Sequence, residues 1–213
     1  MRLDHVSYVA SHDQISDVVN RIGSQIGTAF VDGGIHPKFG TRNFTAPLLN
    51  GQYIEIVCPL DHPATDTTPF GQAVKKKAEA GGGWLSWILA IEDIAKIEKR
   101  LGRNSIPGSR KKPDGSELNW KQIGVLGTLE DAQLPFFIEW ISSSHPSTDG
   151  VAKAKISKIE IVGSIEKIAS WTDNSDLAGA LGTCELKVEK NPNEINGVAS
   201  VHFDLKGQTV LIS

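Results

Sequence analysis

Apolar and polar positions follow a pattern of strands and helices that repeats along the chain. Residues 3–9 alternate apolar and polar side chains, as a half-buried strand does. From residue 13 to Gly23 the apolar side chains share one helical face, and Gly23 is placed to end that helix. A glycine-rich loop at 32–40 and two strands between 42 and 57 follow. This order predicts a unit of one strand, one helix and two or three strands.

The same order returns twice more. A strand at 84–91, a helix at 93–101 and three strand-like runs between 102 and 141 form a second unit. A third, weaker copy runs from residue 156 to the end of the chain. The pattern predicts an α+β fold in which tandem βαβββ modules form a curved, mostly antiparallel sheet around a cleft, with a degenerate third module at the C-terminus.

The repeat also predicts the domain organisation. We expect a domain at 1–146, with modules at about 1–60 and 84–146, and a C-terminal βαβββ-like module at 155–213. The third module holds Lys158 where the first holds His5, so we expect it to be structural. Its apolar sheet face needs a cover. That cover is either the first two modules or the same module of a second chain, and we favour the resulting homodimer.

Composition limits the classes of function. The 213 residues are 39% hydrophobic and 22% charged, which is typical of a folded domain. A net charge of −3 gives no positive field for nucleic acid, and the basic runs at 75–77 and 110–112 are expected to be solvated faces. No run reaches the roughly 18 apolar residues of a membrane span, and no secretion signal is visible, so we expect a cytoplasmic protein. No nucleotide-binding fingerprint is present, so no nucleotide cofactor is expected.

Charged side chains lie inside the apolar strands at corresponding places of the first two modules. Strand alternation puts Glu55 on one face with Tyr53 and Val57, and we expect this face to be the concave one. Glu139 lies in the corresponding strand of the second module, and His5 lies in the first strand of the chain. Carboxylates buried without a partner are costly, and a cation would supply that partner.

These residues and motifs resemble those of a known superfamily. His5 in LDHV, Glu55 in YIEIV and Glu139 in FFIEW, set in repeated modules, resemble the vicinal oxygen chelate superfamily, which includes glyoxalase I, extradiol dioxygenases and bleomycin-resistance proteins. The glyoxalase-like branch is the closer match, through the stretches at 33–43 and 134–146 and through KPDGSELNWK at 112–121.

The resemblance implies a divalent metal ion, such as Zn, Mn, Fe or Ni, held by His5, Glu55 and Glu139. The fourth ligand position falls on Trp84 or Ser86, and neither is a usual ligand. Either water completes a three-ligand site, or no metal binds. In the second case His5 is a core histidine and the two carboxylates accept N–H bonds. If the site exists, the three side chains should lie within about 5 Å of one point, because metal bonds are roughly 2 Å long.

The loop motif adds candidate binding residues. His36 lies beside glycines that permit close backbone approach, and it could complete the metal site, act as a general acid or base, or anchor a substrate. Thr41, Asn43 and Trp120 are expected to contact substrate, while His12, His62, His145 and His202 are expected to be structural or exposed.

Three functions follow as hypotheses. The first is a metal-dependent lyase, isomerase or dioxygenase that acts on a small oxygen-bearing substrate, with Glu139 and His36 as catalytic residues. The second is a metal-free protein of the same fold that binds or sequesters a small molecule. The third is a structural or regulatory subunit. The missing fourth ligand weakens the hypothesis of a metal-dependent enzyme and strengthens that of a metal-free binding protein.

Overall fold

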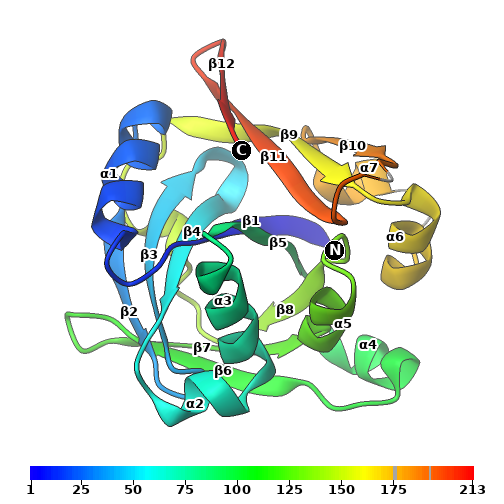
Figure 1. Ribbon diagram of the computed structural model, residues 1–213, viewed down its shortest axis with the longest axis horizontal. Coiled ribbons are helices and arrows are strands. Elements are labelled where there is room, and N and C mark those ends of the chain that lie inside the picture. The colour runs from blue at the N-terminus through cyan, green and yellow to red at the C-terminus, as the bar shows by residue number, and fades with distance from the viewer. Residues whose placement is uncertain (175–176, 192) are drawn as a thin grey trace.

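A closed barrel forms the centre of the molecule (Figure 1). The computed structural model describes residues 1–174, 177–191 and 193–213. Eight strands close in the order β1-β4-β3-β2-β6-β7-β8-β5, and four more form a second sheet, β10-β9-β11-β12. The predicted α+β fold is confirmed. The curved sheet closes because β1 pairs with β5 as well as with β4, which leaves the barrel no free edge.

The first module has the order of one strand, one helix and three strands that the pattern predicts. It consists of β1 (Arg2–Val9), α1 (Ile15–Ile26), β2 (Val31–His36), β3 (Thr41–Leu48), the turn η1 (Leu49–Gly51) and β4 (Gln52–Pro59). Helix α1 does not end at Gly23, because Ile26 is still buried; it ends at Gly27, whose φ of 65° suits glycine. The first half of the predicted glycine-rich loop is strand β2, which joins the two modules through the Ile35–Lys111 pairing.

The second module repeats the first with one added helix. It contains β5 (Gly83–Ala90), α4 (Ile94–Leu101), β6 (Ile106–Lys111), β7 (Glu117–Ile123), α5 (Val125–Glu130) and β8 (Phe136–Trp140). Helix α4 begins after its cap Asp93 and ends at Gly102, as the pattern predicts. Strand β7 stops at Ile123, because Gly124 turns the chain with a φ of 105° into α5.

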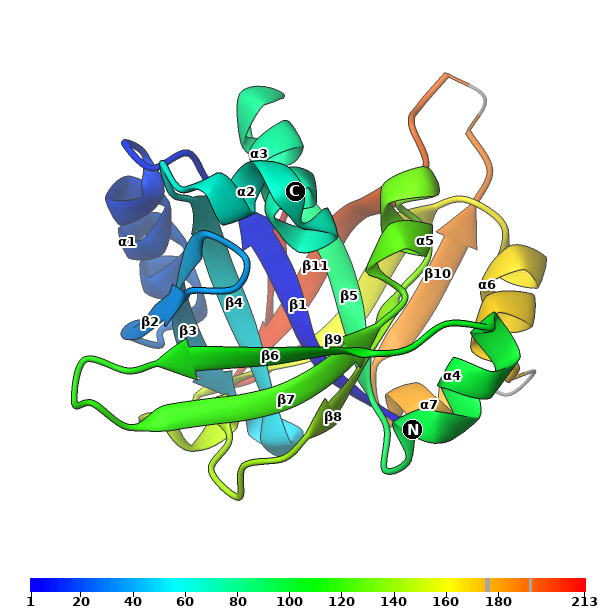
Figure 2. The same cartoon turned by 90° about the horizontal axis from the view of Figure 1, so that it is seen from below.

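Two segments close the ends of the barrel. Helices α2 (Pro63–Thr67) and α3 (Pro69–Glu79) follow the end of β4 and stand over one end, where Phe70 and Val74 enter the cluster of side chains inside the barrel (Figure 2). The short helix η2 (Pro146–Thr148) packs against η1, β3 and β4 at the opposite end of β4. No helix in the described part of the chain is long and apolar enough to span a membrane.

The third module covers the outside of the barrel. It contains β9 (Ala154–Val162), α6 (Ile165–Thr172), α7 (Leu177–Leu181), β10 (Glu185–Glu189), β11 (Gly197–Leu205) and β12 (Gln208–Ile212). Strand β11 lies against β5, and the indole Nε1 of Trp84 donates to the carbonyl of Ile212 at 2.9 Å. One apolar core joins this sheet to the barrel. The chain itself therefore covers the face that prompted the homodimer, and the dimer and the boundary near 150 stay predictions.

Candidate functional site

The barrel encloses a small cavity between the two modules. The space that the centre of a water-sized sphere can reach in this cavity is about 30 Å³. The polar side chains of the lining, here called the polar wall, come mainly from the first module, with Arg110 and Gln122 added by the second: His5, His36, Asn43, Tyr53, Glu55, Arg110 and Gln122. The apolar and mostly aromatic side chains, here called the aromatic wall, are Phe70, Trp120, Phe136, Ile138 and Trp140. The combination of apolar surface and convergent polar groups is a feature of small-molecule sites.

Glu55 is the carboxylate of the polar wall, on the face that strand alternation predicted. Its two oxygens accept hydrogen bonds from Ser7 Oγ and Asn43 Nδ2, both at 2.7 Å. Burial by itself would raise the pKa of Glu55, but the nearby His5 and His36 and the two hydrogen bonds outweigh it and hold that pKa below its usual value. Glu55 is therefore an ionised carboxylate inside the barrel.

His5 is held by its neighbour Asp4 through a β-bulge. Leu3 pairs with Leu89 and His5 with Ile88, so Asp4 is the extra residue of the strand and can lie beside the His5 ring. The Nδ1 of His5 lies 2.9 Å from Asp4 Oδ2. An ionised Asp4 can only accept, so Nδ1 carries the proton. The Nε2 of His5 has no hydrogen-bond partner in the described residues, and His5 lines the cavity.

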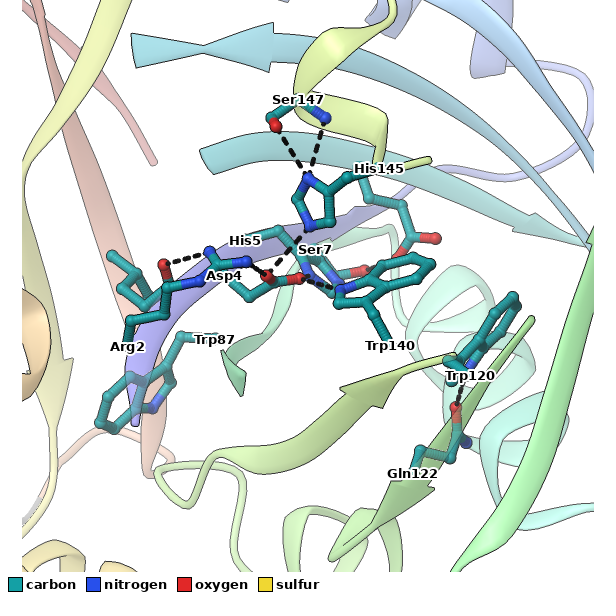
Figure 3. A network of polar contacts seen from close by, with 12 residues as sticks. Arg2, Asp4, His5, Ser7, Trp87, Trp120, Gln122, Trp140, His145 and Ser147 are labelled. Carbon is teal, nitrogen blue, oxygen red and sulfur yellow. Dashed lines mark hydrogen bonds and ion pairs between the residues drawn. The ribbon is translucent and has the colours of Figure 1, made fainter. Parts of the chain in front are cut away.

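Asp4 is the centre of a wider network (Figure 3). Its oxygens also accept from Trp140 Nε1 at 3.2 Å and His145 Nε2 at 3.1 Å, and Oδ1 forms an ion pair with Arg2 Nη2 at 2.9 Å. Burial would raise the pKa of Asp4, but the hydrogen bonds and positive charge of His145 and His5 lower it far below its usual range. The network fixes two cavity side chains, His5 and Trp140, and ties η2 to the barrel wall.

His36 is a neutral histidine packed among aromatic rings. Its Nδ1 lies 2.9 Å from Thr41 Oγ1, and its ring meets those of Phe70 and Trp120 edge to face. Burial lowers the pKa of His36 to about 4, with a further lowering by the nearby Arg110 that Glu55 opposes. Thr41 thus orients His36 rather than lining the cavity, whereas Asn43 and Trp120 do line it, as predicted.

The prediction that Arg110 belongs to a solvated basic face is wrong. Its side chain is only 2% exposed and lines the cavity. Its Nη1 donates to Asn43 Oδ1 at 3.2 Å, and its Nη2 lies 3.8 Å from a carboxylate oxygen of Asp149. Alternation along β6 could have separated Arg110 from Lys111, which is exposed, but the sequence analysis treated 110–112 as one basic run.

Glu139 lies on the outer face of the barrel, so the prediction that it converges with His5 and Glu55 is wrong. Phe136, Ile138 and Trp140 point into the cavity, and Glu139 instead lies 4.0 Å from the Nζ of Lys121. The sequence likeness between the two strands hides a shift of one residue, and a shift of one residue exchanges the faces of a strand. The catalytic and metal-ligand roles predicted for Glu139 lose their basis.

The cavity does not fit the metal that the fold family implies. The residue paired with His5 on β5 is Ile88, and the inward residues of β8 are apolar or aromatic. Ser86 pairs with Ser7, and Trp84 binds the third module, so neither predicted fourth ligand serves. Among the described residues no group of three or more His, Cys, Asp or Glu side chains could hold a metal ion. His5, His36 and Glu55 all line the cavity beside Arg110, but they do not form such a group, so His36 does not complete a metal site.

The absence of a side chain at Gly33 leaves space for Asn43 and Arg110 of the polar wall. A Cβ at this position would lie 2.1 Å from Asn43 Oδ1 and 2.4 Å from Arg110 Nη1. We expect Gly33→Ala to displace both side chains and to lower the free energy of unfolding by about 1–3 kcal/mol, as overpacking does. Urea unfolding measures this. Gly115→Ala is the control, since a Cβ there meets nothing and only its φ of 84° is strained. An unchanged Gly33→Ala midpoint would contradict the packing described.

Comparisons with known proteins agree with this architecture. A family model described as a glyoxalase-like domain matches residues 3–174. A solved structure of a hypothetical protein from Staphylococcus aureus covers 100% of this chain and 98% of its own, with 17% identity and a TM-score of 0.65. It therefore shares the fold over the third module as well.

Shorter structures match about two thirds of the chain. Methylmalonyl-CoA epimerase from Mycobacterium tuberculosis covers 65% of this chain and 86% of its own, with 14% identity and a TM-score of 0.43. A variant of the Streptomyces coelicolor epimerase, in complex with 2-nitronate-propionyl-CoA, covers 68% and 99% with 14% identity and a TM-score of 0.42. A search of curated protein sequences gives no match.

Proposed function

We propose that this chain, which belongs to the glyoxalase-like domain family, binds a small organic molecule inside its barrel without a resident metal ion. The observation that carries the proposal is the enclosed cavity with one polar and one aromatic wall. The aromatic wall would hold the apolar part of the ligand, and His5, Asn43 and Glu55 would orient its polar part. The small volume favours a ligand of a few heavy atoms, or the end group of a larger one.

Metal-dependent lyase, isomerase or dioxygenase chemistry, which the resemblance implies, has less support. Two of the three predicted ligands, His5 and Glu55, share the cavity, and Glu139 does not. A metal ion would also meet the guanidinium of Arg110 close by. The binding protein is therefore the better reading, and its location in the cytoplasm stays part of the proposal.

A second candidate is proton transfer by the chain's own residues. The observation that favours it is that Asp4 orients the His5 ring through Nδ1 and leaves Nε2 without a partner in the described residues, while Glu55 is ionised in the same cavity. Either group could remove a proton from a bound molecule, with Arg110 and Asn43 near a developing oxyanion. Incubation of an identified ligand with the protein in D₂O tests this. Exchange of a carbon-bound proton, lost in both His5→Asn and Glu55→Gln, is the expected result for an enzyme.

A fragment screen tests the binding proposal. We expect small polar–apolar fragments to bind the chelator-treated full chain at one saturable site, as seen by saturation-transfer NMR. Ile138→Phe is the matched blocking variant, because a larger side chain at this cavity position would fill the space at a cost of about 1–3 kcal/mol in stability. Binding that is equal in the wild type and in a folded Ile138→Phe variant would place the ligand elsewhere and contradict the proposal.

A further inference from the structure

Resting on the proposed function, we infer that the cavity takes the protonated amine of a small organic molecule, with Glu55 as its counter-ion and the aromatic wall around it. The ligand class is therefore an organic cation, in place of the metal ion that the cavity does not fit. Four features of the described residues carry this inference.

The first feature is that Glu55 has no cationic partner. Its two hydrogen bonds come from the neutral groups of Ser7 and Asn43, and no Lys, Arg or His nitrogen of the described residues lies within 4.0 Å of its oxygens. A carboxylate buried without a cation is costly, and each of its oxygens keeps a further lone pair. A positive group on a ligand would supply the missing partner.

The second feature is a second acceptor in the same wall. Because Asp4 takes the proton-bearing Nδ1 of His5, the Nε2 of the neutral imidazole presents a lone pair. A ligand group that meets both His5 and Glu55 must therefore donate hydrogen bonds in more than one direction. A primary ammonium, with three N–H donors, does this, whereas a carboxylate can only accept.

The third feature is the aromatic wall. Trp120 and Trp140 pack with ring centroids 5.8 Å apart, and Phe136 and Phe70 continue the wall with centroids 6.2 Å apart. Aromatic faces attract an ammonium by cation–π interaction but cannot act as ligands to a metal ion. A carboxylate within an aromatic enclosure thus selects an organic cation.

The fourth feature concerns the one arginine of the cavity. Arg110 directs Nη1 to Asn43 and lies near Asp149, which Lys112 also contacts at 2.7 Å. The charge of the guanidinium is therefore met by Asp149, and through Asn43 its Nη1 helps to aim an N–H at Glu55, while the buried Nη2 has no hydrogen-bond partner among the described residues. Asn43 bonds both Arg110 and Glu55, so an anionic ligand bound to Arg110 would lie near the negative charge of Glu55 and be repelled by it. Binding of an anion is the rival outcome of the test.

Three probes of one size separate these outcomes: propylammonium, 1-propanol and propionate, titrated into the full chain at neutral pH and followed by ligand-observed NMR. We expect propylammonium to bind at least tenfold more tightly than 1-propanol, as hydrogen bonds to a charged group do, and propionate to bind most weakly. In Glu55→Gln the preference for the amine should be lost. In the matched control Glu139→Gln, whose carboxylate lies outside the cavity, the preference should persist.

Each contrary result has a distinct meaning. If 1-propanol binds as well as propylammonium, the cavity is a ligand site without charge selection, so the inference fails and the proposed function stands. If propionate binds most tightly, Arg110 is the anchor and the inference is wrong. If none of the three probes and no fragment binds, both fail. Where Glu55→Gln does not fold, the order of the three probes on the wild type decides the question.

Discussion

Replacing Asp4 with Asn is expected to lower the free energy of unfolding by about 3 kcal/mol, because it breaks a buried charged network. Oδ2 of Asp4 accepts from His5 and Trp140, and Oδ1 accepts from His145 and forms an ion pair with Arg2. Whichever way an Asn side chain is turned, its NH₂ group faces two N–H donors. The variant is isosteric, so the loss reports hydrogen bonding and charge rather than packing.

Equilibrium unfolding in urea measures this loss. Arg2→Met is the matched control: Arg2 contacts the same carboxylate, but its side chain is 49% exposed, so we expect a loss below about 1 kcal/mol. A loss below 1 kcal/mol for Asp4→Asn would mean that the network is not a unit of the fold. It would also remove the basis for the fixed orientation of His5.

The free energy of unfolding should fall by about 3 kcal/mol as the pH drops from 6.5 to 4, through His36 alone. In the unfolded chain His36 takes up a proton below its usual pKa of 6.5, whereas burial keeps it neutral in the fold down to a pKa of about 4. The unfolded state then binds more protons, so acid favours it. Asp4, whose pKa is lowered in the fold, adds a further loss below about pH 4, when the unfolded carboxylate is protonated first.

Variants separate His36 from the other titrating groups. Unfolding free energies measured between pH 7 and 4 should depend less on pH in His36→Gln than in the wild type. His12→Gln, which removes an exposed histidine, should keep the wild-type slope. Equal slopes in the wild type and His36→Gln would show that His36 is protonated in the fold, contrary to its dry, aromatic surroundings.

The fold could be predicted from the sequence because its signals are local and repeated. Strand alternation recurs in each module. The glycine that ends α4 and the turn at Asn50-Gly51 are signals of one or two residues that mark the ends of elements within a module. The first module's site residues His5, His36, Asn43 and Glu55 also follow from alternation together with the motif. In each of these cases the side-chain direction depends on neighbours along the same strand.

The missed features depend on pairing between strands. The sequence does not reveal that β8 is shifted by one residue, which sends Glu139 outward and Ile138 inward. Nor does it reveal the bulge in β1, because a bulge is defined by the register with β5. Asp4, adjacent to His5, would point away from it in a regular strand. The inward face of β8 and the bulge in β1 were missed because each strand was treated as regular and was considered without its partner strands.

The indole N–H signals of the five tryptophans test the central claim most directly, in one ¹⁵N NMR titration of metal-free protein with a bound fragment. Trp120 and Trp140 line the cavity and donate to Gln122 and Asp4, whereas Trp84, Trp87 and Trp171 donate to backbone carbonyls elsewhere. We predict that the ligand shifts the first two signals and leaves the other three in place, with chelator present throughout. Shifts that occur only after a divalent metal ion is added would contradict the account.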